Sequence, residues 1–271
     1  MCTLLDAHHD VAMSYELYPN LLETDVNIDL TRVSKAIRKA WGSRALAACM
    51  PTPRFNTFVN RCDRGGLSKG EVAQLFERLA EEGHHTSQLE GRLRMVELCG
   101  LTKMNKVKKK RWGMKCNNSY DDYLSYWPTA TFLNMVRDGR DVLASQLNTG
   151  NFKNSPSDLG RSWANTHLAF DRLVQSEGVS AKFVFYEKLT ANPGTELQNI
   201  CEFLSLDFAP SMLAHHEQDL TVFNAQHLSH ARITQSIDTS MIGRWREDLT
   251  PQQVEEFVAA AGDSLKSFGY V

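Results

Sequence analysis

TFLNMVRDGRDVLAS, residues 131–145, is the stretch that decides the fold expected of this chain. Residues 131–136 form a short apolar run, which is typical of a strand buried on both faces. A charged segment then interrupts the run, in which Asp138 can cap a following helix and Gly139 permits a tight reversal. Apolar residues resume beyond it at helical spacing, at Val142, Leu143 and Leu147. The stretch therefore predicts a strand, a sharp turn and a helix.

Such a turn is a natural place for an anionic ligand. In open α/β sheets, anions bind beyond the carboxyl end of a strand and near the amino terminus of a helix. Arg137 leaves the predicted strand at that point, and Ser145 follows eight residues later on the predicted helix. An arginine fork and a hydroxyl are suited to binding a phosphate. The plain alternative is a solvated turn with incidental charges.

The same fifteen residues resemble a segment of the sulfotransferases, which use 3′-phosphoadenosine 5′-phosphosulfate (PAPS) as donor substrate. In that family an arginine at the strand end and a serine eight residues later hold the 3′-phosphate, and Arg137 and Ser145 match both. The resemblance implies an α/β fold of the P-loop nucleotide-kinase-like sulfotransferase type. That fold is a three-layer parallel sheet with helices on both faces.

Two further segments resemble the reactive part of that family. Residues 4–19 are similar to a segment of the tyrosylprotein and related bacterial branch, where a glutamate deprotonates the acceptor, and Glu16 falls on that glutamate. Residues 112–115 resemble a strand that ends in a lysine directed at the transferring sulfuryl group, and Lys115 matches it. The resemblance implies catalytic roles for Glu16 and Lys115. A solvated strand-end glutamate is the alternative for Glu16.

Two more segments resemble nucleotide-binding parts of the family. Tyr-Glu-x-Leu followed by Asn-Pro, beginning at Tyr186, is similar to a block near the nucleotide, although a core tyrosine is equally compatible with the pattern. Residues 236–249 resemble the loop that closes over the adenosine and the 3′-phosphate, and Gly243, Arg244 and Trp245 fit its Gly-x-Trp ending. These residues are therefore expected to bind the nucleotide.

One part of the family pattern is absent from the 271 residues. Sulfotransferases carry a strand and a Gly-x-x-Arg-Ser-Gly-Thr-Thr type loop before the segment that residues 4–19 resemble, and its backbone amides wrap the 5′-phosphosulfate. The expected fold is therefore N-terminally truncated. Two functions stay open: transfer of a sulfuryl group from PAPS to a hydroxyl or amine, or a degenerate or truncated non-catalytic protein that retains only nucleotide 3′-phosphate or partner binding.

Periodicity predicts the remaining elements. Strands are expected at residues 11–15 and 181–186, and amphipathic helices at 158–177 and from Thr250 onward. Ser68 and Glu71 form a capping-box pattern that predicts a helix through residue 82. Residues 45–64, which contain two prolines, are expected to be irregular. The chain is expected to be one domain, 1–271, with a helical insertion at about 42–101.

Composition excludes several classes of protein. A content of 42% hydrophobic and 23% charged residues with a net charge of −2 is ordinary for a globular protein and gives no general attraction to nucleic acid. The basic run at 103–115 is expected to be a solvated face, because a nucleic-acid module would require interleaved aromatics and a basic domain. Its alternative, a nucleic-acid-binding module, would bind with a steep dependence on salt.

Metal, membrane and redox signals are also weak. The six cysteines are scattered, so we expect reduced thiols, and the adjacent histidine pairs lack the spacing of metal ligands, so no metal is expected. No run reaches about 18 apolar residues and no signal-peptide pattern opens the sequence, which predicts a cytoplasmic protein without a membrane span. The acceptor, whether protein tyrosine, carbohydrate, lipid or small metabolite, and the oligomeric state stay undecided at this level.

Overall fold

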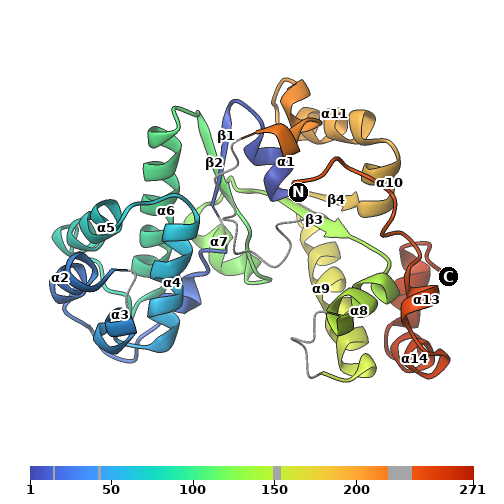
Figure 1. Ribbon diagram of the computed structural model, residues 1–271, viewed down its shortest axis with the longest axis horizontal. Helices are drawn as coiled ribbons and strands as arrows, with labels where there is room; N and C mark the ends of the chain where they lie inside the picture. The colour runs from blue at the N-terminus through green and yellow to red at the C-terminus, as the bar shows by residue number, and fades with distance from the viewer. Residues whose placement is uncertain (15, 42–43, 149–153, 219–233) are drawn as a thin grey trace. The chain divides into compact units, whose positions relative to one another are not determined.

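The computed structural model describes residues 1–14, 16–41, 44–148, 154–218 and 234–271 (Figure 1). The chain divides into two compact units. Unit 1 comprises Met1–Pro128 and Ala209–Ser236, and unit 2 comprises Thr129–Phe208 and Ile237–Val271. The expectation of one domain over residues 1–271 stays a prediction.

Unit 1 contains a pair of parallel strands, β1 (Val11–Ser14) and β2 (Arg111–Met114). Their register runs from Val11 opposite Arg111 to Ser14 opposite Met114. All four residues of β1 are buried, as its apolar sequence predicts, and α1 (Cys2–Asp6) precedes it. The predicted strand near residues 11–15 is confirmed for its described part, whereas Tyr15 lies outside the described residues.

Helices connect β1 to β2, because parallel strands require a long crossover. They pack around a core that includes Phe55, Phe58 and Phe76, and Figure 1 shows them in blue to green. After α1, the helical elements in the described part of unit 1 are, in chain order, η1 (Pro19–Leu22), α2 (Leu30–Ala40), α3 (Arg44–Cys49), α4 (Pro53–Arg64), α5 (Lys69–Glu81), α6 (Leu89–Lys106), α7 (Tyr120–Tyr126), η2 (Pro210–Met212) and η3 (His215–Glu217). The insertion expected at about 42–101 is helical wherever it forms regular structure, and its first residue lies outside the described ones.

One helix of this unit follows its sequence signal closely, and another contradicts the prediction. The capping box of Ser68 and Glu71 is formed at the start of α5, so this prediction is confirmed. The irregular structure expected at residues 45–64 is wrong, because α3 and α4 occupy most of that range. Thr52 caps α4 by accepting a hydrogen bond from the backbone N–H of Phe55 at 3.2 Å. Pro53 occupies the first turn, where a missing N–H costs nothing.

Unit 2 contains the second parallel pair, β3 (Thr131–Val136) and β4 (Ser180–Phe185), paired along their whole length. The connection between them runs through α8 (Gly139–Asn148) and α9 (Pro156–Val174), and α9 packs against both strands. After β4 the unit adds α10 (Tyr186–Ala191), α11 (Pro193–Phe203), α13 (Trp245–Asp248) and α14 (Pro251–Ser267), and α14 packs along α9. The strand, turn and helix predicted for residues 131–145 are confirmed.

Asp138 and Gly139, in the turn between β3 and α8, have different structural roles. Asp138 caps α8, since its Oδ1 accepts a hydrogen bond from the backbone N–H of Arg140 at 2.9 Å. Gly139 does not adopt a positive φ, so the expected tight reversal is not the reason for the glycine. A Cβ at this position would lie 2.6 Å from Phe257 Cζ and 2.9 Å from Trp163 Cδ2. Gly139 is therefore required by the close packing of α14 and α9 against the turn.

The chain is thus an α/β protein with parallel strand pairs. All six cysteines are free. Within the described ranges, no group of three or more histidine, cysteine, aspartate or glutamate side chains could hold a metal ion. A search of the same residues finds no helix with the length and apolar character that a membrane crossing requires.

Candidate functional site

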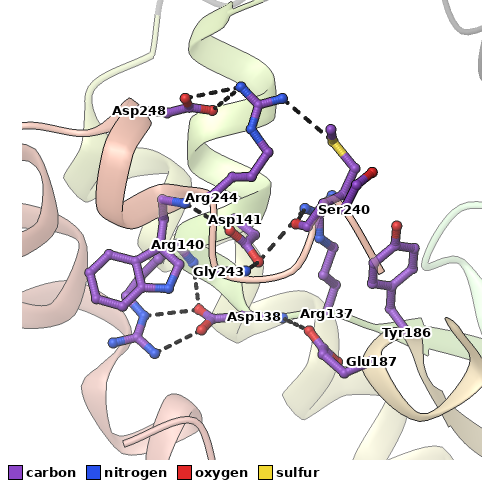
Figure 2. Close-up of polar contacts among 12 residues, drawn as sticks. Arg137, Asp138, Arg140, Asp141, Tyr186, Glu187, Ser240, Gly243, Arg244 and Asp248 are labelled. Atoms are coloured by element: carbon purple, nitrogen blue, oxygen red, sulfur yellow. Dashed lines mark hydrogen bonds and ion pairs between the residues drawn. The ribbon is translucent and has the colours of Figure 1, made fainter. Parts of the chain in front are cut away.

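Arg137 lies where β3 ends and α8 begins, and three groups fix its guanidinium (Figure 2). Its Nη2 donates a hydrogen bond to the carbonyl oxygen of Met241 and lies 3.7 Å from Asp141 Oδ2. Its Cζ lies 4.7 Å from the centroid of the Tyr186 ring. The Arg137 side chain is 18% exposed. The structure therefore brings Arg137 and Tyr186 together, as the predicted nucleotide site requires.

Asp141, in the first turn of α8, holds the segment that contains Gly243 and Trp245. Its Oδ2 accepts a hydrogen bond from the backbone N–H of Gly243 at 2.8 Å, and its Oδ1 accepts one from that of Trp245 at 2.9 Å. The Asp141 carboxylate is fully buried, so it needs such charge-assisted donors to offset the loss of water. Gly243 has φ +76°, which favours glycine at this bend. Two of the three predicted loop residues are thereby fixed at the amino end of α8.

A ring of hydrogen bonds fixes the other carboxylate of the turn, Asp138. Arg140 forms a fork with it, from Nε to Oδ1 at 3.0 Å and from Nη2 to Oδ2 at 2.7 Å. Glu187 Oε1 accepts the backbone N–H of Asp138 at 2.9 Å, and Glu187 Oε2 accepts the Tyr270 hydroxyl at 2.8 Å. Burial, followed by the hydrogen bond to Glu187, raises the pKa of Tyr270 well above its usual value. Both carboxylates of the turn are therefore compensated, and the Arg137 side chain beside them is 18% exposed.

Arg244 and Trp245 do not contact Arg137. Arg244 Nη2 lies 3.0 Å from both oxygens of Asp248, one helical turn further on, and the Arg244 side chain is 41% exposed. Two guanidinium groups stack on the Trp245 ring. The Cζ of Arg140 lies 4.1 Å from the ring centroid, and the Cζ of Arg246 lies 4.5 Å from it. In this structure Arg244 is engaged by Asp248, so a contact with a ligand would require it to change partner.

Ser145 is exposed on α8, and the described residues give its hydroxyl no hydrogen-bond partner. Two buried donors nearby are also unpaired within the described part of the chain, namely Nε of Arg137 and Nε1 of Trp245. Buried donors normally have partners, so each of these N–H groups favours an acceptor beyond those that the described residues supply. This observation fits an anionic ligand at the β3–α8 turn.

The two predicted catalytic residues meet in unit 1. Glu16 and Lys115 follow β1 and β2, whose parallel register brings the ends of both strands to the same edge. Lys115 Nζ lies 2.5 Å from Glu16 Oε1, and the Lys115 side chain is 51% exposed whereas that of Glu16 is 15% exposed. A second cation, Arg61 on α4, lies 3.1 Å from Glu16 Oε2 through its Nη2. The predicted base is thus a carboxylate between two cations.

Sequence reasoning missed the residues that hold these groups in place. The hydrogen-bond partners of Asp141 lie 102 and 104 residues away along the chain, so no local pattern predicts its role. Glu187 belongs to the Tyr-Glu-x-Leu motif, which gave it no role. Arg61 lies in a segment expected to be irregular, so no pattern related it to Glu16. Of these three residues, only Glu187 lies in a recognised motif, so only its position near the site could have been predicted from the sequence.

Comparison with known proteins finds similarity to sulfotransferases. A family model described as the sulfotransferase family matches residues 1–210. A Caenorhabditis briggsae protein named putative protein-tyrosine sulfotransferase is 28% identical over 149 residues, covering 48% of this chain and 51% of that protein. A Caenorhabditis elegans protein of the same name is 26% identical over 145 residues, covering 48% of this chain and 55% of that protein. The chain therefore spans about half the length of the curated relatives that it matches.

Solved structures extend the comparison to the fold. The sulfotransferase domain from the Synechococcus PCC 7002 olefin synthase matches with a TM-score of 0.58 at 16% identity, covering 97% of this chain and 94% of that domain. The sulfotransferase domain from the curacin biosynthetic pathway matches with a TM-score of 0.55 at 15% identity, covering 96% of this chain and 91% of that domain. Similarity at this level of identity shows a shared fold.

Proposed function

Because the chain belongs to the sulfotransferase family, we propose that it transfers a sulfuryl group from PAPS to a hydroxyl or amine acceptor. The observation that carries this proposal is the arrangement at the amino end of α8. There Arg137 stacks on Tyr186 at 4.7 Å, and Asp141 holds the Gly243–Trp245 segment beside it. An arginine fork beside an aromatic ring suits a nucleotide that carries a phosphate on its ribose.

The nucleotide-binding roles follow from these positions. Arg137 and the Ser145 hydroxyl would bind the 3′-phosphate, and Tyr186 would lie beside the nucleotide. Gly243 and Trp245 would contribute the closing segment, in which Arg244 would bind the nucleotide only after leaving Asp248. The unpaired Nε of Arg137 supports an acceptor at this place.

The catalytic roles belong to Glu16 and Lys115. Sulfuryl transfer resembles phosphoryl transfer, in which positioned cations and a base for the nucleophile supply most of the catalysis. Lys115 would neutralise charge on the leaving oxygen, and Glu16 would accept the proton of the acceptor. The two nematode relatives are named for protein tyrosine, so a tyrosine-containing peptide is the first acceptor to test. The three-layer arrangement and its truncated form stay predictions.

A non-catalytic protein that binds only the nucleotide is the second candidate. The observation that favours it is the pairing of Glu16 with two cations, Lys115 at 2.5 Å and Arg61 at 3.1 Å. A carboxylate that both cations hold is a weak base, so the protein would bind the nucleotide without activating an acceptor.

A transfer assay with radiolabelled PAPS separates the two candidates. The acceptor panel contains a tyrosine peptide, a polysaccharide, a hydroxylated lipid and a small alcohol. We expect a labelled product that is lost in the Lys115→Met and Arg137→Ala variants. If the parent protein binds 3′-phosphoadenosine 5′-phosphate (PAP) but labels none of the four acceptors, the proposed activity is wrong and the non-catalytic function is correct.

A further inference from the structure

We propose that Arg61 is a positioning residue for Glu16, and that it keeps hold of the carboxylate while Lys115 leaves it for the reacting group. This inference rests on the proposed function, since it assigns how the base of that reaction is held. It concerns a residue to which neither the sequence motifs nor the comparisons give a role. Arg61, Glu16 and Lys115 all belong to unit 1.

Arg61 contacts both the backbone and the side chain of Glu16. Its Nη1 donates a hydrogen bond to the Glu16 carbonyl oxygen at 2.7 Å, and its Nη2 lies 3.1 Å from Glu16 Oε2. Its Cζ lies 5.1 Å from the centroid of the Tyr18 ring, two residues further along the chain. The planar fork of an arginine can make such contacts together, whereas a lysine ammonium cannot reproduce their geometry.

The backbone of Glu16 needs this support. Glu16 has φ +46°, a left-handed conformation that residues with a Cβ adopt at a cost. Its carbonyl oxygen accepts hydrogen bonds from Arg61 Nη1 and from the Tyr18 backbone N–H at 2.9 Å. A non-glycine residue in a rare conformation persists when its surroundings hold it there. Arg61 therefore determines where the carboxylate points, in addition to neutralising it.

The two cations on Glu16 differ in freedom. The Arg61 side chain is 19% exposed and is fixed by three contacts, whereas the Lys115 side chain is 51% exposed and its ammonium pairs with one oxygen of Glu16, Oε1. A flexible lysine stem can turn toward a new anion at small cost. Oε1 is thus the oxygen that becomes available, while Oε2 stays with Arg61.

The reaction step follows from this asymmetry. Lys115 moves from Oε1 to the oxygen that bridges sulfur and the 5′-phosphate of PAPS. The acceptor O–H or N–H proton passes to Oε1 as the acceptor forms its bond to sulfur. The bridging S–O bond breaks, and its electron pair leaves with PAP, whose new negative charge Lys115 neutralises. A carboxylate with both cations still attached would be a weaker base, because each cation favours the ionised form.

The titration of Glu16 distinguishes a positioning role of Arg61 from a merely structural one. If Arg61 were only structural, its replacement would leave the midpoint of this titration unchanged. The charged or titratable groups that interact with Glu16 include Lys115, Arg61 and the thiol of Cys2 on α1. Removing Arg61 removes one cation, so protonation of the Glu16 carboxylate becomes easier and the midpoint of its titration rises. The same change moves the acid limb of the kcat/KM profile to higher pH.

The experiment compares the parent protein with Arg61→Met, Arg61→Lys and Arg64→Met. Arg64 is an exposed residue at the end of the same helix, so its variant controls for loss of charge. Carbon NMR of labelled glutamate, assigned with Glu16→Gln, gives the titration midpoint, and transfer from PAPS gives kcat and KM. We expect kcat to fall about 10- to 100-fold in Arg61→Met, with KM for PAPS within about twofold.

The outcomes separate the two proposals. In Arg61→Lys the midpoint of the Glu16 titration should stay close to that of the parent, because the lysine restores the positive charge. Its kcat should be only partly retained, because the lysine lacks the planar guanidinium. If Arg61→Met does not fold, the kcat and the Glu16 titration midpoint of Arg61→Lys test the role of Arg61. An unchanged kcat and midpoint in the folded Arg61 variants would overturn the role of Arg61. A parent protein without transfer activity would overturn the proposed function, and the NMR midpoints would still show whether Arg61 holds the carboxylate.

Discussion

At the scale of single residues, one buried carboxylate organises the candidate nucleotide site. Asp141 binds the backbone of Gly243 and of Trp245 and lies 3.7 Å from Arg137. A fully buried carboxylate is stable only when its oxygens are compensated, and here two N–H donors and a guanidinium do so. Its charge therefore contributes both to folding and to the position of the closing segment.

Replacing Asp141 by asparagine should destabilise the protein. The amide keeps the shape of the side chain, but its NH2 group faces a backbone donor instead of accepting from it. We expect the free energy of unfolding to fall by about 1–3 kcal/mol. Urea unfolding measures this change, with exposed Asp263→Asn on α14 as the matched control, expected within about 0.5 kcal/mol of the parent. Equal stability of Asp141→Asn and the parent would contradict the role of the carboxylate.

His167 on α9 makes stability depend on pH. Burial lowers its pKa from 6.5 to about 4, and its ring packs on Trp163 with centroids 4.8 Å apart. Between these values the unfolded chain binds a proton that the folded protein does not, so stability falls as the pH is lowered through this window. The loss amounts to about 2 kcal/mol by pH 5.

The measurement is urea unfolding of the parent and of His167→Leu at pH 7 and pH 5. We expect the variant to lose less stability than the parent between the two pH values, because it cannot bind the proton. The matched control is His9→Gln, since the His9 side chain is 63% exposed, and its loss should equal that of the parent. A loss in His167→Leu as large as in the parent would contradict the assignment.

At the scale of elements, the β3–α8 turn shows what packing adds to local sequence. The strand, the cap at Asp138 and the helix could be predicted because each depends on neighbours in the chain. The need for glycine at position 139 comes from Phe257 on α14, which no local pattern relates to it. Similarly, Pro53 indicated a break, although it lies at the start of α4 with Thr52 as its cap. Prolines mark helix starts as well as loops.

Adding one methyl group at Gly139 should therefore be costly. Gly139→Ala places a Cβ 2.6 Å from Phe257 Cζ, so we expect thermal or urea unfolding to show a loss of about 1–3 kcal/mol. Gly262→Ala on α14 is the control, because the nearest atom to its Cβ is Val258 Cγ1 at 3.8 Å. That variant should be as stable as the parent or gain up to about 1 kcal/mol. Identical effects of the two substitutions would show that packing does not explain Gly139.

At the scale of the whole molecule, the candidate residues fall into two groups. Glu16 and Lys115 belong to unit 1, whereas Arg137, Tyr186 and the Gly243–Trp245 segment belong to unit 2. Sequence motifs predicted both groups, because each lies beside a strand end or a recognisable loop. They could not predict Arg61 or Asp141, whose roles depend on contacts across 45 or more residues. The partner of Arg244 was also unexpected, since the Gly-x-Trp match ends at Trp245, three residues before Asp248.

Arg137 is proposed to bind the 3′-phosphate of the nucleotide, and this role is tested by measuring the binding of two nucleotides to two forms of the protein. Calorimetry gives Kd for PAP and for adenosine 5′-phosphate, which lacks the 3′-phosphate, with the parent and with Arg137→Ala. A charge-assisted contact contributes about 1.5–3 kcal/mol, so the variant should bind PAP about 10- to 100-fold more weakly. Its affinity for adenosine 5′-phosphate should change by less than about twofold. Equal affinity of the parent and Arg137→Ala for PAP would contradict the account.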